Sequence, residues 1–260
     1  MTFCRGVPHA EKLGWRLGCQ TWSFHDTTFY DALDRTASLG LHYVEAFPGQ
    51  QLRSGSPLRL NEELPAAARR ELCKRLSDQG LTLVNFGVGG CSWAVFDLAK
   101  DLGIETVISE PPAEELDRLD ELCVAYGLNL ALHNPPRPAR FWQPRSLLRA
   151  CLGCSRRIGV CGDTGHWMRS GVRPLEAVGT LCGRILCLHL KDLNGYGRKA
   201  HEVPWGTGCG DIRALLTEVH CQRQRPFFPI EYERHVGWSL LEIVRCIEYF
   251  DAVAAELTKR

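Results

Sequence analysis

Eight short apolar segments recur along the 260-residue chain, and each is followed by a stretch with helical character. The segments are LGCQTW (17–22), YVEAF (43–47), LTLVNFG (81–87), TVISE (106–110), LNLALHN (128–134), IGVCGD (158–163), ILCLHLKD (185–192) and FFPIEYE (227–233). Apolar runs of this length, bounded by Gly, Pro or polar residues, are typical of strands buried on both faces, as in parallel sheets. This alternation predicts a parallel α/β fold.

The segments between the strands carry helix-ending signals. Helix candidates include residues 29–40, 66–80, 114–127 and 239–257. Gly40, Gly80 and Gly127 end three of them, where a helix C-terminus needs a residue with positive φ just before the next strand. Eight strand–helix repeats predict a closed (β/α)₈ TIM barrel, with an open doubly wound sheet as the alternative. We expect one domain over residues 1–260, with 1–15 as an N-terminal extension.

Composition excludes several classes of protein. The chain has 45% hydrophobic and 23% charged residues, which are ordinary globular values. With Lys+Arg 31 and Asp+Glu 30, the net charge of +1 gives no general attraction to nucleic acid or to an anionic membrane. No apolar run approaches the roughly 18 residues of a membrane span, and the N-terminus lacks the apolar stretch of a signal peptide. We therefore expect a cytoplasmic protein.

The cysteines do not predict a disulfide framework. There are 13, an odd number, and several lie in apolar segments where a reduced thiol behaves as a small hydrophobe. Cys151 and Cys154 have the spacing of a zinc knuckle, but no second pair stands nearby. We expect both to be ordinary thiols.

Acidic and histidine side chains mark the C-terminal ends of the predicted strands. They are Glu45, Glu110, His133, Asp163, His189 and Glu231. In a barrel these ends meet at one mouth, where active sites lie. Unpaired charges are costly to bury, so a ring of such groups indicates a partner, and imidazole with carboxylate suits a divalent cation. The pattern predicts a metal site at the mouth.

The last two strands add further polar residues. Period two places His189 and Lys191 on one face of their strand, and it does the same for Glu231 and Glu233. Asp192 should face away, as a helix cap or a structural ion pair. The long glycine-rich segment 194–211 should cover the mouth. Its GTGCGD sequence resembles a phosphate cradle, but it does not directly follow a strand, so we infer no phosphorylated substrate.

Together these segments resemble the sugar phosphate isomerase/epimerase superfamily, whose members have a xylose isomerase-like barrel. The resemblance runs from about Leu17 to Tyr249. Its motifs stand here as Glu110-Pro111-Pro112, His133-Asn134-Pro135-Pro136, Asp163-Thr164-Gly165-His166-Trp167, His189-Leu190-Lys191-Asp192, Pro204-Trp205-Gly206-Thr207-Gly208 and Glu231-Tyr232-Glu233. The set is specific to the superfamily but does not define a substrate.

The resemblance implies one divalent cation (Mn, Mg, Co or Zn) held by side chains at the ends of the fifth to eighth strands. Asp163, His189 and Glu231 match three of its ligands. Epimerases place a glutamate on the fifth strand, where this chain has His133, so either His133 or Glu110 is the fourth. Pro135 stands where related sequences have the second histidine of H-N-H-P, which removes a proton carrier or ligand and leaves full activity open.

A barrel of this kind is expected to isomerise, epimerise or dehydrate a keto-sugar or polyol through an enediolate. Glu231 is the expected base, and Glu110 or His133 would return a proton. Lys191 would hold charge on a substrate oxygen. His166 would bind a substrate hydroxyl or orient Asp163. The other predicted substrate-binding residues are Trp22, Glu45 and Trp205.

Other interpretations remain open at this stage. An inosose-type dehydratase would use the same barrel, and loss of a catalytic residue at Pro135 would leave a non-catalytic sugar-binding barrel. An apurinic endonuclease with three metals would need more ligands and a basic face than the sequence supplies. A homo-oligomer is possible, and the expected partner is a small sugar or polyol, with no nucleic acid and no membrane.

Overall fold

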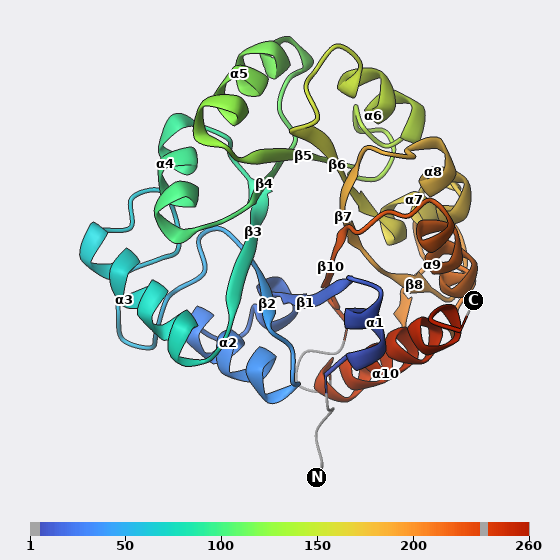
Figure 1. The fold of residues 1–260 in the computed structure, drawn as a ribbon, viewed down its shortest axis with the longest axis horizontal. Coiled ribbons are helices and arrows are strands. Elements are labelled where there is room, and N and C mark those ends of the chain that lie inside the picture. The colour runs from blue at the N-terminus through green and yellow to red at the C-terminus, as the bar shows by residue number, and fades with distance from the viewer. Residues whose placement is uncertain (1–5, 235–238, 260) are drawn as a thin grey trace.

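The computed structural model describes residues 6–234 and 239–259, in which eight parallel strands close into a barrel (Figure 1). The strands are β1 (Arg16–Gln20), β2 (Tyr43–Ala46), β3 (Thr82–Gly89), β4 (Thr106–Ser109), β5 (Asn129–His133), β6 (Ile158–Asp163), β7 (Ile185–His189) and β10 (Phe227–Ile230). Because β1 pairs in parallel with both β10 and β2, the sheet has no free edge. The closed barrel is confirmed, and the open doubly wound sheet is wrong.

Helices follow the strands and form an outer ring (Figure 1). They are α1 (Pro8–Lys12), α2 (Phe29–Ser38), α3 (Ala66–Asp78), α4 (Trp93–Leu102), α5 (Leu116–Tyr126), α6 (Pro144–Cys151), α7 (Thr164–Arg169), α8 (Pro174–Thr180), α9 (Ile212–Cys221) and α10 (Ser239–Leu257), with short 3₁₀ turns at η1 (Thr21–Phe24) and η2 (Ala113–Glu115). The expected glycines Gly40, Gly80 and Gly127 do have positive φ, of 72°, 64° and 71°. These glycines turn the chain from a helix into the next strand.

Two packed clusters stabilise the barrel. The larger one joins strands to the surrounding helices, and its buried members include Leu33 of α2, Leu72 of α3 and Phe250 of α10. The smaller one takes one residue from each of several strands and lies within the barrel: Val84, Ile108, Ala131, Cys161, Cys187 and Phe227. Successive side chains of each strand point alternately into the barrel and toward the helices, and apolar residues fill both sides.

The expected N-terminal extension contributes α1, which packs beside α10 (Figure 1). The backbone N–H groups of His9 and Ala10 donate to Asp251 Oδ1 at 2.8 and 3.0 Å.

Within the described ranges, no helix is both long and apolar enough to span a membrane.

The segment after β7 differs from the expected irregular loop. β8 (Asp192–Leu193) and β9 (Glu202–Val203) pair in antiparallel fashion and make a small hairpin. β7 ends at His189 and β10 at Ile230, earlier than expected. Lys191 and Glu231 therefore lie just beyond the strands, at the barrel mouth.

Candidate metal centre at the barrel mouth

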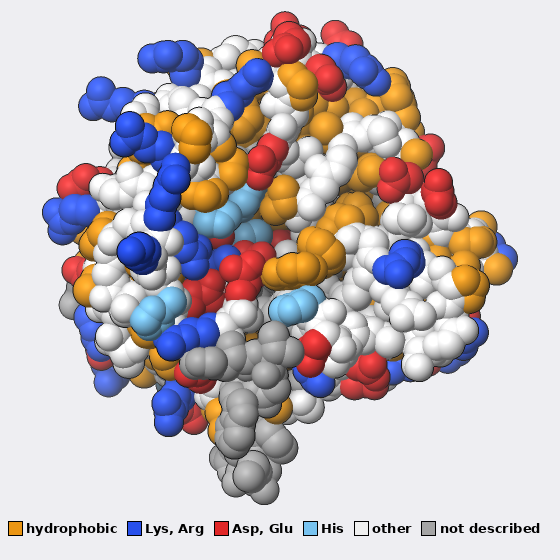
Figure 2. Space-filling view, turned by 180° about the vertical axis from the view of Figure 1, so that it is seen from behind, with side chains coloured by type: hydrophobic (Ala, Val, Ile, Leu, Met, Phe, Trp, Pro, Cys, Tyr) orange, Lys and Arg blue, Asp and Glu red, His pale blue; other side chains and the backbone are white. Residues whose placement is uncertain are grey.

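The strand-end side chains predicted to meet do come together. Figure 2 shows histidine and carboxylate side chains gathered in a hollow near the centre of one face. Potential ligand atoms of Asp163, His189 and Glu231 all lie within 4.8 Å of one another, as do those of His133, Asp163 and His166. The two groups share Asp163, so this carboxylate is the centre of the cluster.

Asp163 is the last residue of β6 and the N-cap of α7, and its two carboxylate oxygens make different contacts. Oδ1 accepts the backbone N–H of His166 at 2.7 Å and so caps α7. Oδ2 is buried without a hydrogen-bond partner and lies 3.3 Å from Lys191 Nζ. Burial raises the pKa of Asp163, but the nearby His166 and Lys191 outweigh it and hold the pKa below its usual range. Asp163 is therefore an ionised acceptor facing the mouth.

The Asp-Thr-Gly-His motif has a local steric reason. A Cβ on Gly165 would lie 2.9 Å from Lys191 Cβ, so a larger residue would push the two segments apart. Asn134, which follows β5, also holds the motif: its Oδ1 accepts Asp163 N–H at 2.6 Å, and its Nδ2 donates to Asp163 O at 3.0 Å. The sequence analysis missed this role of Asn134, because only the pairing of β5 with β6 brings the two residues together.

His189 is fully buried at the end of β7. Its Nε2 bonds to Glu45 Oε1 at 2.7 Å, and its Nδ1 lies 3.2 Å from Glu231 Oε2. Burial lowers the pKa of His189, but the carboxylates of Glu45 and Glu231 outweigh burial and raise it well above the ordinary value. Asn85 Nδ2 donates to the other Glu45 oxygen at 2.9 Å. Both oxygens of Glu45 are thus occupied.

Lys191 is the centre of positive charge in the site. Its side chain is 1% exposed, and Nζ lies 2.9 Å from Glu231 Oε2 and 3.3 Å from Glu233 Oε2. Burial lowers the pKa of Lys191, but Asp163 and Glu231 raise it well above the ordinary value. Burial likewise raises the pKa of Glu231, whereas Lys191 and His189 outweigh it and bring the pKa well below its usual range. The predicted sharing of a face by His189 and Lys191, and by Glu231 and Glu233, agrees with these contacts.

His133 and His166 border the cluster on its other side. His133 Nδ1 bonds to Glu110 Oε1 at 2.7 Å, and His166 Nδ1 bonds to the backbone oxygen of Asn134 at 3.0 Å. If each Nδ1 carries the proton, each Nε2 keeps a lone pair. Burial lowers the pKa of His166, which favours the neutral ring. A metal-ligating histidine commonly has such a second partner on its other nitrogen, and this favours His133 over Glu110 as a ligand.

Glu202 on β9 is a functional candidate that the sequence analysis missed. It is 3% exposed, its Oε1 lies 3.6 Å from Lys191 Nζ, and its Oε2 accepts Glu233 N–H at 2.9 Å. Burial raises its pKa to about 7, against the opposing effect of Lys191. The segment that contains Glu202 has no apolar strand pattern in its sequence, so only the hairpin geometry could reveal this residue.

The donor set fits a divalent cation. Asp163 Oδ2 and His189 Nδ1 are buried and make no hydrogen bond, and each lies beside a charged group, Lys191 Nζ at 3.3 Å and Glu231 Oε2 at 3.2 Å respectively. Mixed imidazole and carboxylate ligands are typical of zinc, manganese and related ions. The cluster therefore has the types of ligand that such an ion requires, within reach of one another.

Several solved structures resemble this chain over most of its length. No family model matches the chain, and no curated protein matches it. An uncharacterised protein from Parabacteroides distasonis is 32% identical, with a TM-score of 0.74, over 91% of this chain and 98% of that one. A xylose isomerase-like TIM barrel protein from Mycobacterium smegmatis, solved with magnesium, is 14% identical, with a TM-score of 0.76, over 94% and 97% of the two chains. The chain is a xylose isomerase-like TIM barrel. It belongs to the same family as the Parabacteroides protein.

A third solved structure is the IOLI protein with a bound zinc atom. It is 13% identical, with a TM-score of 0.72, over 93% of this chain and 99% of that one. At this identity the likeness to IOLI, as to the Mycobacterium protein, shows the fold alone.

Two predicted substrate-binding residues of this xylose isomerase-like barrel have other positions. Glu45 is fully buried and bonds to His189 Nε2 at 2.7 Å, so in this structure it positions the histidine. Trp205 is 2% exposed, donates its indole N–H to Leu190 O at 3.1 Å and packs against Phe250. Trp205 closes the core and does not wall the pocket. Trp22 is half-buried at the mouth, and its indole N–H donates to Glu233 Oε1 at 3.1 Å.

Asp192 and the GTGCGD segment form a structural unit of their own. The Asp192 carboxylate accepts the backbone N–H groups of Gly206, Gly208 and Gly210 at 2.9, 2.9 and 2.8 Å. The prediction that Asp192 would be a helix cap or an ion pair is wrong. The segment does cradle an anion, but that anion is the chain's own carboxylate. A Cβ on Gly208 would lie 2.4 Å from Asp192 Oδ1, so the close approach requires glycine.

Proposed function

We propose that the protein is a divalent-metal-dependent isomerase or epimerase that acts on a keto-sugar or related polyol through an enediolate. The observation that carries this proposal is the convergence of Asp163, His189 and Glu231, whose potential ligand atoms all lie within 4.8 Å of one another at the barrel mouth. Asp163, His189, Glu231 and His133 would hold the ion. When bound, it would supply Lewis-acid stabilisation of negative charge on substrate oxygen. The metals in the magnesium and zinc structures of this fold support the choice of a divalent ion.

Glu231 would accept the proton from the substrate carbon. The ammonium of Lys191 and the imidazole of His189 hold the pKa of Glu231 well below its usual range, so its carboxylate is ionised, as a proton acceptor must be. Its side chain is 11% exposed, which leaves it open to the mouth where a substrate would lie.

Glu110 would return a proton on the other side of the site. Its side chain is 39% exposed and is bonded to His133, so it can exchange protons with water and with the imidazole. Lys191 would stabilise negative charge on a substrate oxygen, because its ammonium faces the same space as Glu231. His166 and Trp22 border this space and would orient the substrate. Pro135 lines a small neighbouring cavity with Glu110, where it cannot carry a proton.

Hydrogen exchange tests this function directly. The metal-loaded protein is incubated in D₂O with fructose, psicose, tagatose and an inosose, and NMR follows the proton next to each carbonyl. We expect exchange on at least one compound, and a loss of about 10²–10⁴-fold in Glu231→Gln, the usual contribution of a general base. Dehydration on the same barrel would appear in the same spectra as loss of water from the ring.

Glu233→Gln is the matched control, since Glu233 also contacts Lys191 but is 38% exposed. It should reduce exchange far less than Glu231→Gln does, with both variants folded by circular dichroism. Exchange that persists in Glu231→Gln would remove Glu231 as the base. A parent protein that exchanges none of these compounds would contradict the enzyme and favour a sugar-binding barrel.

A further inference from the structure

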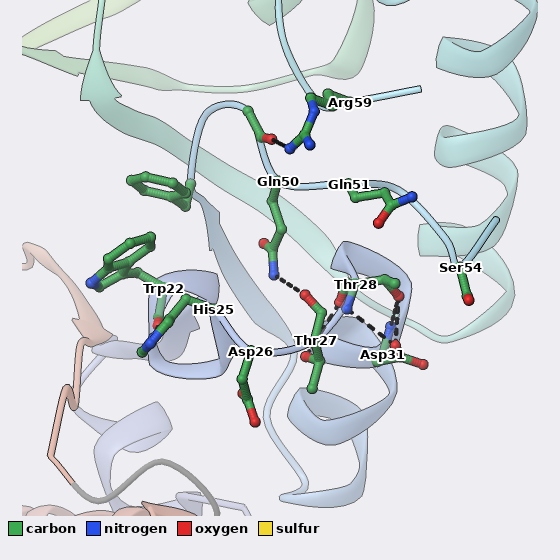
Figure 3. Close-up of a pocket in the computed structure, with 12 residues that line it drawn as sticks. Trp22, His25, Asp26, Thr27, Thr28, Asp31, Gln50, Gln51, Ser54 and Arg59 are labelled. Carbon is green, nitrogen blue, oxygen red and sulfur yellow. Dashed lines mark hydrogen bonds between the residues drawn. The ribbon is translucent and has the colours of Figure 1, made fainter. Parts of the chain in front are cut away.

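A cavity of about 510 Å³ lies beside the metal centre, between the segments that follow β1 and β2 (Figure 3). We propose that it is a second subsite, and that the substrate carries an uncharged, hydroxyl-rich group such as a second sugar ring. This proposal rests on the proposed function, because it extends the substrate of the same mouth. A volume in this range is typical of small-molecule pockets, which hold ligands of about 300–1,000 Å³.

The cavity adjoins the metal centre through Trp22. The Trp22 ring forms part of the cavity wall, and its indole N–H donates to Glu233, whose other oxygen lies 3.3 Å from Lys191 Nζ. A molecule that reaches over Trp22 from the mouth would therefore enter the cavity. One substrate can span both.

The wall offers an aromatic surface of the kind that binds the apolar face of a sugar. Trp22 and Phe47 have ring centroids 4.3 Å apart, and Trp22 stacks on His25 at 4.6 Å. Figure 3 shows Trp22 and His25 on one side of Gln50, with Thr28 and Asp31 on the other. A ring held between these sides would contact both apolar and polar groups.

Gln50 is a mostly buried polar residue of this wall. The side chain is 8% exposed, and its amide nitrogen donates to the Thr27 backbone oxygen at 3.1 Å. That bond orients the amide, and it leaves Oε1 without a hydrogen-bond partner. Oε1 is itself covered, so Gln50 contributes to the cavity by fixing the shape of its wall.

The charges of the wall favour an uncharged ligand. Asp26 and Asp31 contribute carboxylates, and Arg59 contributes the one guanidinium among the described lining residues. Asp31 accepts hydrogen bonds from Thr28, and Asp26 lies 3.8 Å from the Arg35 guanidinium. Two carboxylates oppose a phosphate, whereas the mixture of donors and acceptors suits hydroxyl groups, which both donate and accept.

The cavity is preformed by backbone hydrogen bonds. Gly49 N–H donates to Leu60 O at 2.7 Å, and Leu60 N–H donates to Gln50 O at 2.9 Å, which closes the segment on itself. Phe29 N–H donates to Gln51 O at 2.8 Å, which ties the segment to the start of α2. A site built on such a frame loses little conformational entropy when it binds a ligand.

Calorimetry on the metal-loaded protein tests the subsite with fructose, with glucosyl-fructoses linked through O3, O4, O5 or O6 of the ketose, and with fructose 6-phosphate. At least one disaccharide should bind about tenfold more tightly than fructose, since about 1.4 kcal/mol is available from one added ring. Ser54→Trp, which fills the cavity rim, should reduce that ratio to about twofold or less. Arg53→Trp is the matched control, because Arg53 is exposed on the same segment and does not line the cavity.

A ratio near one in the parent protein would overturn the subsite, as would an unchanged ratio in Ser54→Trp. Tightest binding of fructose 6-phosphate would overturn the uncharged ligand. These results are separate from the catalytic proposal, because hydrogen exchange on fructose without a disaccharide preference removes only the subsite. A disaccharide preference without exchange on any ketose removes only the enzyme.

Discussion

Asp163, at the end of β6, and Asp192, just beyond β7, are both buried aspartates of the same barrel, yet they serve opposite purposes. Asp192 is surrounded by three backbone N–H donors, so its carboxylate needs nothing further. Asp163 has one oxygen in a helix cap and one with no hydrogen-bond partner. In this fold the number of backbone donors, rather than burial, separates a structural carboxylate from one prepared for a ligand.

The largest expected effect concerns the structural side of this comparison. Asp192→Ala should lower the free energy of unfolding by about 2–4 kcal/mol, because it leaves buried N–H groups without an acceptor. Urea denaturation followed by circular dichroism measures the change. Ser92→Ala is the control: it removes only the N-cap of α4, and should cost about 1 kcal/mol. Equal losses in the two variants would show that the three backbone hydrogen bonds to Asp192 stabilise the fold no more than one helix N-cap does.

A smaller effect is expected beneath the metal site. Glu45→Gln should weaken metal binding by about 10–100-fold, as is usual when a hydrogen-bond partner of a ligating histidine is changed. Glu45 bonds to His189 Nε2 at 2.7 Å and is fully buried, so it cannot reach the substrate. Metal titration monitored by competition with a chelator measures the affinity. If affinity holds while the KM for sugar rises, the original prediction of Glu45 as a substrate residue would be restored.

The smallest effect concerns Trp205. Trp205→Phe should cost about 1 kcal/mol of stability, because it removes one buried hydrogen bond to Leu190 and leaves most of the ring packing in place. Thermal unfolding measures this loss. The KM for the sugar should stay within twofold of the parent value, and a larger change in KM would return Trp205 to the pocket wall.

The sequence predicted the barrel well because its signals are local. Apolar runs, glycine C-caps and helical periods each depend on neighbouring residues, and closure follows from repeating them eight times. The strand-end residues were predicted to gather for a topological reason: the C-terminal ends of parallel strands meet at one mouth. Asp163, His189 and Glu231 follow this rule.

Details that depend on contacts between distant segments were beyond the sequence. Glu202 reaches Lys191 only because β8 and β9 form a hairpin, and Asn134 meets Asp163 only through the register of β5 and β6. Glu45 was predicted at a strand end, but its hydrogen bond to His189, 144 residues away, was not. The roles of these residues depend on hydrogen bonds between segments far apart in the sequence, and the periodicity of the sequence does not predict those bonds.

Elemental analysis of the purified protein shows whether the strand-end cluster holds a divalent ion, with Asp163→Asn compared against Asp192→Asn. We expect about one divalent ion per chain in the parent protein and in Asp192→Asn, and a strong loss in Asp163→Asn, whose ligand set is incomplete. Equal metal content in the folded Asp163→Asn protein would contradict this expectation.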